Sequence, residues 1–248
     1  MMIKTFTSIL FIALLYTNTS LAQKNDKLPQ IIKQLNLTKD LVKEEFVTSK
    51  AMPNEPNAVL YIIPEVSDEG DGFWTADMVV VKVLSSTGKV IAYSKFKDAI
   101  QSDAINLNNI IIDTAPYIIK PGKRAFAVRL RSANNSRAAG FDGEEFFLIE
   151  EKEGKFVKVL QLDSEKNISY GAAECENTEN NFQKSIFSID TRHSSNGYFN
   201  IIEKIHHELY NFDKNCDEGK KDIKTFINVF EYKNGEYVCP SGRKDGQQ

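Results

Sequence analysis

Apolar and polar residues alternate with a period of two along much of the chain, which is the pattern of half-buried β-strands. The alternation is clearest in residues 125–131, where Phe126 and Leu130 fall on one face of a strand and Arg129 and Arg131 fall on the other. A polar loop follows this strand, and then a hairpin with a Glu-Gly turn. We take this strand, loop and hairpin as one unit of the fold.

Looser versions of the same unit lie on both sides, in residues 58–93 and 184–238. The hairpins in these flanking segments turn at Thr87-Gly88 and Asn234-Gly235, and Asn196-Gly197 is a further turn signal. Glycine-punctuated hairpins without long helices between them argue against a parallel sheet. We therefore predict an all-β protein, a mostly antiparallel meander of about ten to twelve strands in a barrel-, sandwich- or propeller-like arrangement.

One short helix is expected before the strands. Leu28, Ile31, Ile32 and Leu35 recur at helical spacing, and Pro29 falls in the first turn. An isolated helix of this length is marginal in water, so we expect it to pack on the body of the protein.

The first 22 residues have the three parts of a secretory signal peptide. A positive start is followed by the apolar run SILFIALLY and by Ser20-Leu21-Ala22, which predicts cleavage after Ala22. The apolar run is too short to cross a bilayer, and no later stretch is apolar enough. We expect a soluble periplasmic or secreted protein, with a single β-rich domain over residues 23–240 and a polar tail over residues 241–248.

The charge and the motifs narrow the range of functions. The net charge of −3 argues against a general nucleic-acid-binding protein, which needs excess lysine and arginine to displace counterions from phosphate. The sequence lacks the glycine-rich phosphate-binding motifs and the motifs of serine hydrolases and zinc peptidases. We therefore expect no cofactor.

Export would place the three cysteines in an oxidising compartment, where disulfides persist. Cys175 and Cys216 each lie in a polar, acidic loop, and Cys239 follows the last strand. Three cysteines allow one internal pair, for which we favour Cys175–Cys216. Pairs that involve Cys239 remain open on this reasoning.

Two regions are candidates for ligand binding. Arg129 and Arg131 project from the central strand, and Asn135, Arg137 and Asp142 follow in the polar loop, so together they are candidates for binding an anionic or sugar ligand. The only tryptophan, Trp74, stands beside the acidic segment SDEGDG and is either a binding platform or a rim residue that caps the core.

Metal and catalytic chemistry have weaker support. The acidic loops lack the ligand spacing of a calcium-binding EF-hand loop, so no metal site is predicted. His206 and His207 are adjacent on a predicted strand and must point to opposite faces. A hydrolase acting on glycan or peptide through loop carboxylates such as Asp142 and Glu144, with His207 as a base, is the alternative function that remains.

Three segments carry a resemblance to a known group. FAVRLRSANNS, EEFFLIEEKEGKFVKVL and VFEYKNGEYVCP resemble strand and turn patterns in exported bacterial β-rich proteins of unknown function, over residues 125–240. The resemblance supports the Cys175–Cys216 pair and makes Cys239 the extra thiol. It implies no activity.

These patterns favour a non-enzymatic exported protein that binds a protein or another partner in the envelope, as inhibitors, immunity proteins and envelope-associated factors do. A structural envelope protein that self-associates through an exposed edge strand is a further alternative.

Overall fold

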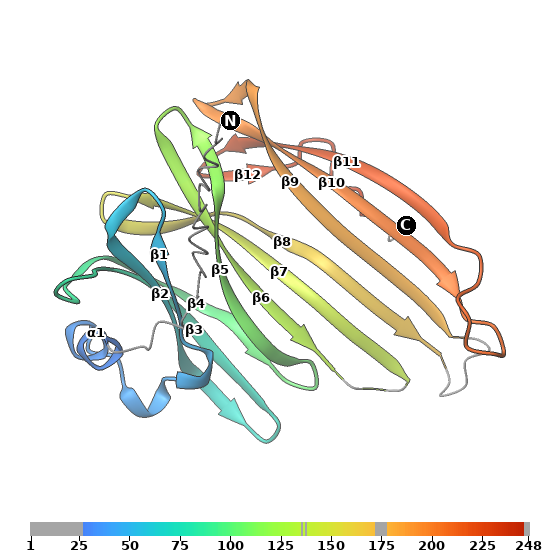
Figure 1. The fold of residues 1–248 in the computed structure, drawn as a ribbon, viewed down its shortest axis with the longest axis horizontal. Helices are drawn as coiled ribbons and strands as arrows, with labels where there is room; N and C mark the ends of the chain where they lie inside the picture. The colour runs from blue at the N-terminus through green and yellow to red at the C-terminus, as the bar shows by residue number, and fades with distance from the viewer. Residues whose placement is uncertain (1–26, 135, 137, 172–177, 246–248) are drawn as a thin grey trace, which may run out of the picture.

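Two antiparallel sheets make up the protein in the computed structural model, which describes residues 27–134, 136, 138–171 and 178–245. The predicted all-β meander with a short N-terminal helix is confirmed (Figure 1). The smaller sheet has the order β1-β2-β3-β4 and the larger one β12-β11-β10-β9-β8-β7-β6-β5. The strands of the smaller sheet are β1 (Thr48–Met52), β2 (Glu55–Gly70), β3 (Phe73–Leu84) and β4 (Val90–Ser102). Those of the larger sheet are β5 (Asn106–Lys120), β6 (Lys123–Ala133), β7 (Ala139–Lys152), β8 (Lys155–Tyr170), β9 (Glu179–Ser195), β10 (Tyr198–Asn211), β11 (Asp222–Lys233) and β12 (Glu236–Val238).

The chain enters the sheets through one helix, α1 (Leu28–Leu35), and two 3-10 turns, η1 (Lys39–Leu41) and η2 (Glu44–Phe46). Pro29 lies in the first turn of the helix, and Asn36 ends it in a left-handed conformation. Leu28 and Ile31 are buried against one face of the small sheet, so the helix packs on the body as its length requires.

Tight turns join neighbouring strands. Glu153, Asn196 and Asn234 have φ values of +53°, +52° and +55°, and each is followed by a glycine that also has positive φ. Consecutive residues of this kind form the turns that match the twist of a β-hairpin. The turns predicted at these three places are therefore confirmed.

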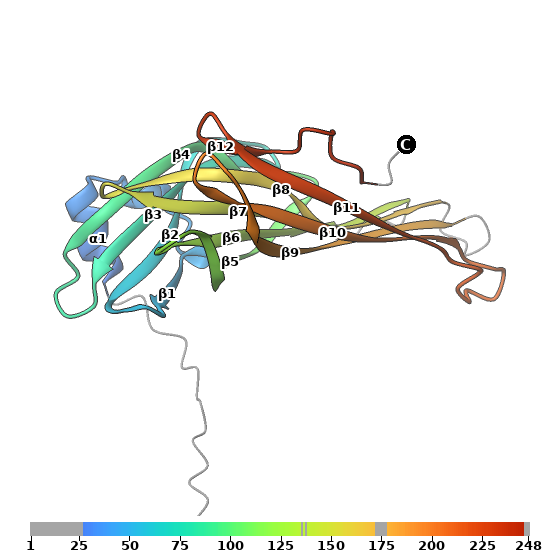
Figure 2. The same cartoon turned by 90° about the horizontal axis from the view of Figure 1, so that it is seen from above.

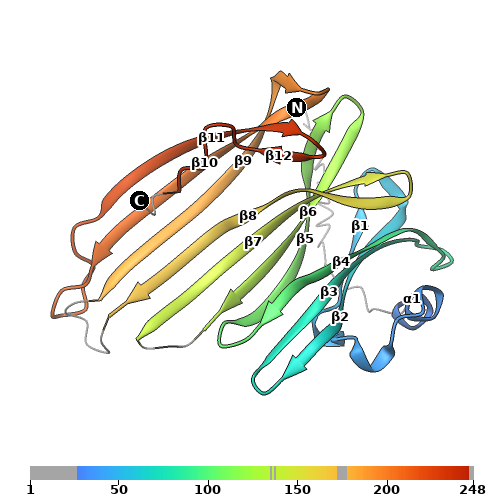
Figure 3. The same cartoon turned by 180° about the vertical axis from the view of Figure 1, so that it is seen from behind.

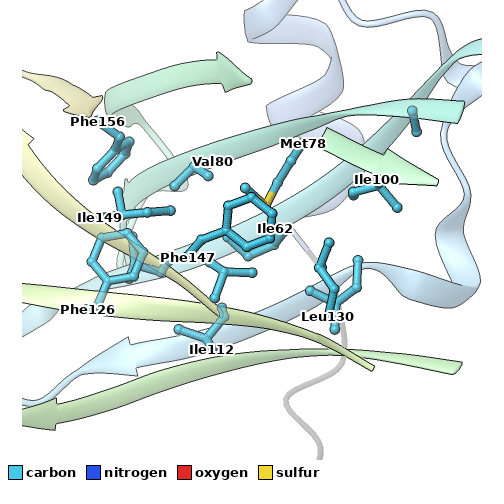
Figure 4. Close-up of a cluster of buried hydrophobic side chains, with 14 of the residues drawn as sticks. Ile62, Met78, Val80, Ile100, Ile112, Phe126, Leu130, Phe147, Ile149 and Phe156 are labelled. Carbon is cyan, nitrogen blue, oxygen red and sulfur yellow. The ribbon is translucent and has the colours of Figure 1, made fainter. Parts of the chain in front are cut away.

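The first core lies between the two sheets (Figure 4). Alternate residues of β2, β3 and β4 face alternate residues of β5, β6 and β7, and Ile62, Met78 and Phe147 are fully buried at the centre. A buried lysine also joins the layers, because Lys82 on β3 pairs with Glu151 on β7 as well as with Glu55. The two layers thus pack as a sandwich over this part of the molecule.

The second core is inside the large sheet, which curls back on itself (Figures 2 and 3). β5, β9 and β12 converge at one end, whereas β6, β7, β10 and β11 fan out toward the other (Figure 1). Phe146 of β7 stacks on Phe187 of β9, with ring centroids 4.5 Å apart. Both faces of β6 and β7 are consequently covered near their middle, which explains why Ala127 and Val128 are equally buried.

The curl also separates β8 from β9 over part of their length. Their pairing covers residues 165–170 of β8 and 179–184 of β9. Beyond this register β9 continues with β10 alone. The C-terminal segment, residues 241–245, lies against β10 and β11 near this gap. Part of the predicted polar tail is thus held on the body.

Two predicted loops are mostly strand. β6 runs to Ala133 and β7 begins at Ala139, and the acidic segment at residues 67–70 belongs to β2. The prediction was wrong because both faces of these hairpin ends are polar, and the strand pairing extends beyond the core.

Candidate functional site

A cluster of charged side chains lies on β5, β6 and β7. The alternation of β6 puts Arg129 and Arg131 on the same face as Ala127, and the register places Glu144 directly opposite Arg131. Arg129 Nη1 donates to Glu144 Oε1 at 2.5 Å, and Arg131 Nε donates to Glu144 Oε2 at 2.9 Å. Arg129 Nη2 also donates to Asp113 Oδ2 at 2.8 Å. Arg129 therefore bridges two carboxylates from two different strands.

A bulge in β5 shapes the other end of this cluster. The register of β5 on β6 shifts between Asp113 and Tyr117. The Asp113 carboxylate accepts hydrogen bonds from the Ala115 amide at 2.9 Å and from the Tyr117 hydroxyl at 2.8 Å. Arg129 also lies over the Phe146 ring, 4.9 Å from its centroid, which fixes the plane of the guanidinium.

These contacts set the protonation states. Burial alone would raise the pKa of Asp113, but hydrogen bonds from the Ala115 amide, Tyr117 and Arg129 lower it below its ordinary value. Burial likewise opposes the charge of Glu144, while Arg131 and Arg129 lower the pKa of that carboxyl. Both carboxylates are therefore ionised at neutral pH, and Glu144 is a poor proton donor.

Burial and the Asp113 carboxylate raise the pKa of Tyr117 to about 12. The phenol therefore stays protonated and donates its hydrogen bond throughout the physiological range.

A charged row extends from this cluster across four strands. Arg131 on β6, Glu144 on β7, Glu165 on β8 and Lys184 on β9 lie opposite one another in successive registers. Lys184 Nζ lies 2.8 Å from Glu165 Oε2. The Arg131 and Lys184 side chains are each about half exposed, at 51% and 53%, so the two ends of the row offer positive charge to a ligand.

The row borders a hollow of about 300 Å³. Its polar lining comes from both ends of the row, from Arg129 and Asp113, and from Lys50 of β1, whose ammonium donates to the Ile112 carbonyl at 3.0 Å. Cations and carboxylates alternate around it. A charged group of a ligand could bind to such a surface by replacing one partner of an existing ion pair.

Exposed apolar residues share the face of β9 that carries Lys184, which is opposite to the face of Phe187. Ile186 follows two residues later on β9, and the registers place Lys204 opposite Ile186 and Ile227 opposite Lys204. Ile186 and Ile227 are each 65% exposed, and Val229, two residues along β11, is 40% exposed. We call Ile186, Ile227 and Val229 the outer apolar patch. A cluster of this kind on a sheet face marks an interaction surface more often than scattered single residues do.

A second hollow, of about 390 Å³, lies between β4, β7 and β8 and is acidic. Its lining includes Asp98, Asp103, Glu145 and Asp163. Burial and the nearby Asp163 raise the pKa of Glu145. Across the described residues, no group of three histidine, cysteine or acidic side chains is placed to hold a metal ion.

The binding residues predicted on the central strand and in its loop divide into three groups. Arg129 and Arg131 are brought together by Glu144. Asp142 precedes Glu144 by two positions on β7 and lies opposite Asn167 and Ala133. Asn135 and Arg137 lie outside the described residues.

Trp74 is on β3 of the small sheet, whereas the charged row is on the large sheet. Its ring packs on Phe46 at 5.7 Å between centroids and carries Lys43 Nζ at 5.6 Å. It contacts the rim of the core between the sheets. Whether it also binds a ligand stays a prediction.

The adjacent histidines point to opposite faces, as the strand period requires. His207 is 3% exposed, and its Nε2 forms a hydrogen bond with Asn181 Oδ1. His206 lies on the outer face and contacts Glu208. Burial lowers the pKa of His207, with a further contribution from Lys224.

The cysteines are described only in part. Cys175 lies outside the described residues, so the Cys175–Cys216 disulfide stays a prediction. Cys216 occupies the turn between β10 and β11, with φ of +67°. Cys239 is a free, partly buried thiol beside the second core.

Sequence reasoning missed two functional candidates, Asp113 and Glu203. Glu203 is fully buried on β10, where Arg243 contacts it. The alternation Ile201, Glu203, Ile205 placed it on the inward face and was a usable signal. Asp113 had no such signal, because the bulge in β5 determines its partners.

No family model, no curated protein and no solved structure matches this chain. Within the described part of the chain, every helix is too short or too polar to cross a bilayer.

Proposed function

We propose that this protein is exported and binds a macromolecular partner of the cell envelope through the outer face of its large sheet. The observation that carries the proposal is the outer apolar patch on β9 and β11, with Lys184 beside it on the same face of β9. Inhibitors, immunity proteins and envelope-associated factors have this non-enzymatic mode of action.

The composition of this face supports a protein partner. An exposed apolar centre flanked by charged and polar residues is the usual make-up of a protein interface. Arg131 and Lys184 keep part of their charge in solvent, so they can steer an acidic partner and fix its orientation. Ile186 and Ile227 would then contribute most of the apolar contact.

Export rests on the N-terminal sequence. Residues 1–22 have the positive, apolar and small-residue parts of a signal peptide. Mass spectrometry of the protein recovered from the periplasm or the medium should give an N-terminus at Gln23. An intact N-terminus on protein that remains in the cytoplasm would contradict export.

The binding proposal is tested by comparing matched surface variants. Affinity capture from envelope extract with the wild-type chain should recover a stoichiometric partner. Ile227→Lys should weaken that partner's affinity at least tenfold, because it places a charge in the apolar centre. The control is Tyr93→Lys, which changes a 52% exposed apolar residue on β4. Equal capture by all three chains would remove the outer face from the proposal.

The charges at the two ends of the row provide a second test. Arg131→Glu should slow association and reduce its dependence on salt if the partner is acidic. An unchanged association rate at low salt would show that the row does not contact the partner.

A further inference from the structure

A fully buried carboxylate organises the inner face of β10. Glu203 has no exposed surface, yet its two oxygens accept four side-chain donors. Ser185 Oγ donates to Oε1 at 2.7 Å, and Asn228 Nδ2 donates to Oε2 at 2.9 Å. Arg243 donates to both oxygens, through Nη2 at 2.7 Å and through Nε at 2.9 Å.

The geometry around Glu203 is that of a specific guanidinium site. The fork of Arg243 matches the carboxylate with two parallel hydrogen bonds, which lysine cannot reproduce. Arg243 Nη2 also donates to the carbonyl of Asp163, at 2.8 Å, near the gap between β8 and β9. The pocket therefore supplies three acceptor contacts in fixed positions.

The backbone next to the arginine is recognised as well. Asn228 Nδ2 donates to the Lys244 carbonyl at 3.0 Å, and the Lys244 amide donates to Asn228 Oδ1 at 2.9 Å. One amide side chain thus pairs with both backbone polar groups of one residue, as a neighbouring strand would. This contact recognises the backbone of an extended chain and does not involve the Lys244 side chain.

The chain's own C-terminal segment does not fill this region. A hollow of about 350 Å³ remains between residues 241–245 and the β11 side chains Lys224 and Phe226. Lys244 is exposed, and the only side chain of the segment that reaches the buried carboxylate is that of Arg243. A longer or bulkier segment has room to occupy the same place.

We propose that Glu203, Asn228 and the Asp163 carbonyl form a recognition site for an arginine-bearing extended peptide, which Arg243 of the same chain occupies until a partner's arginine replaces it. The buried carboxylate supplies charge complementarity, because it requires a cation whenever the protein is folded. The C-terminal segment then acts as an intramolecular competitor. This proposal concerns the inner face and does not depend on the outer apolar patch.

Removing the competitor in the full-length chain tests the proposal. Arg243→Met keeps much of the side-chain volume and leaves Glu203 without its cation. An acetylated and amidated peptide of residues 241–245, Ser-Gly-Arg-Lys-Asp, should bind this variant and raise its melting temperature. The same peptide with alanine in place of arginine should bind at least tenfold more weakly, and Glu203→Gln in the Arg243→Met chain should abolish the difference.

Arg192→Met is the matched control, because Arg192 is an exposed arginine whose loss leaves the pocket intact. Its affinity for the arginine peptide should equal that of the wild type and be well below that of Arg243→Met. Equal binding of the arginine and alanine peptides by Arg243→Met would overturn the proposal.

The wild-type chain provides a readout if Arg243→Met does not fold. Hydrogen exchange should show the Lys244 amide opening far more often than the paired amides of β10, and millimolar arginine peptide should increase its exchange further. Protection equal to that of β10, unchanged by the peptide, would identify the segment as a permanent part of the fold and reject an exchangeable site.

Discussion

Arg129 Nη1 lies 2.5 Å from Glu144 Oε1 in the centre of the large sheet, and the same guanidinium holds Asp113. Arg129→Met should destabilise the protein by about 3 kcal/mol, because the buried Glu144 and the partly buried Asp113 lose their shared partner. Chemical denaturation at pH 7 measures this change. Arg192→Met, at an exposed ion pair, should leave the midpoint unchanged, and an equal loss in both variants would contradict a special role for Arg129.

The same cluster predicts how stability depends on pH. Asp113 and Glu144 have pKa values below those of the unfolded chain, so their contribution is complete above about pH 5 and is lost as pH falls through the folded values. The unfolding free energy should therefore fall on acidification. The fall should be smaller in Arg129→Met, as measured by denaturant titrations from pH 6 to pH 3, and parallel curves would refute the coupling.

The core between the sheets gives a prediction about packing. Phe147→Ala should cost about 4 kcal/mol, since Phe147 is fully buried among side chains from both layers. Tyr93→Ala, at an exposed position on β4, is the control and should shift the denaturation midpoint little. A small effect at Phe147 would mean that the two sheets do not share one core.

The disulfide prediction can be checked on exported protein. A Cys175–Cys216 bond closes a loop of about 40 residues, so its loss in Cys216→Ser should destabilise the protein by roughly 3 to 4 kcal/mol in the chain-entropy model. Non-reducing peptide mapping should recover the pair, and a thiol reagent should label Cys239 alone after unfolding. Labelling of all three cysteines would disprove the bond.

The fold was accessible from sequence because strand alternation and hairpin turns are local signals. The spacing of Phe126 and Leu130 predicts a strand with one apolar face, and Asn234-Gly235 predicts a hairpin turn near the end of the chain. Neither prediction needs information on distant residues. The curl of the large sheet was not accessible, since the stack of Phe146 on Phe187 joins strands that local alternation cannot bring together.

The site was accessible only in part for the same reason. Arg129 and Arg131 stood out as charges on an otherwise apolar strand, so the sequence indicated one side of the cluster. The contacts of their partner Asp113 depend on a bulge in β5. Those of Glu203 depend on an arginine 40 positions later in the chain. Contacts of this kind are fixed by tertiary register, which a single sequence does not display.

The order of the strands has a consequence for how the chain reaches its native state. In both sheets each strand pairs with its immediate neighbours in sequence, so nearly all backbone pairing can form without waiting for remote segments. Folding can therefore advance from the N-terminus as the chain emerges, hairpin by hairpin. The steps that need distant residues are the packing of the two sheets around Phe147, the closure of the curl around Phe146 and the seating of Arg243. Because Arg243 lies beyond the last strand, its contact with Glu203 can form only after β10 and β11 have been synthesised.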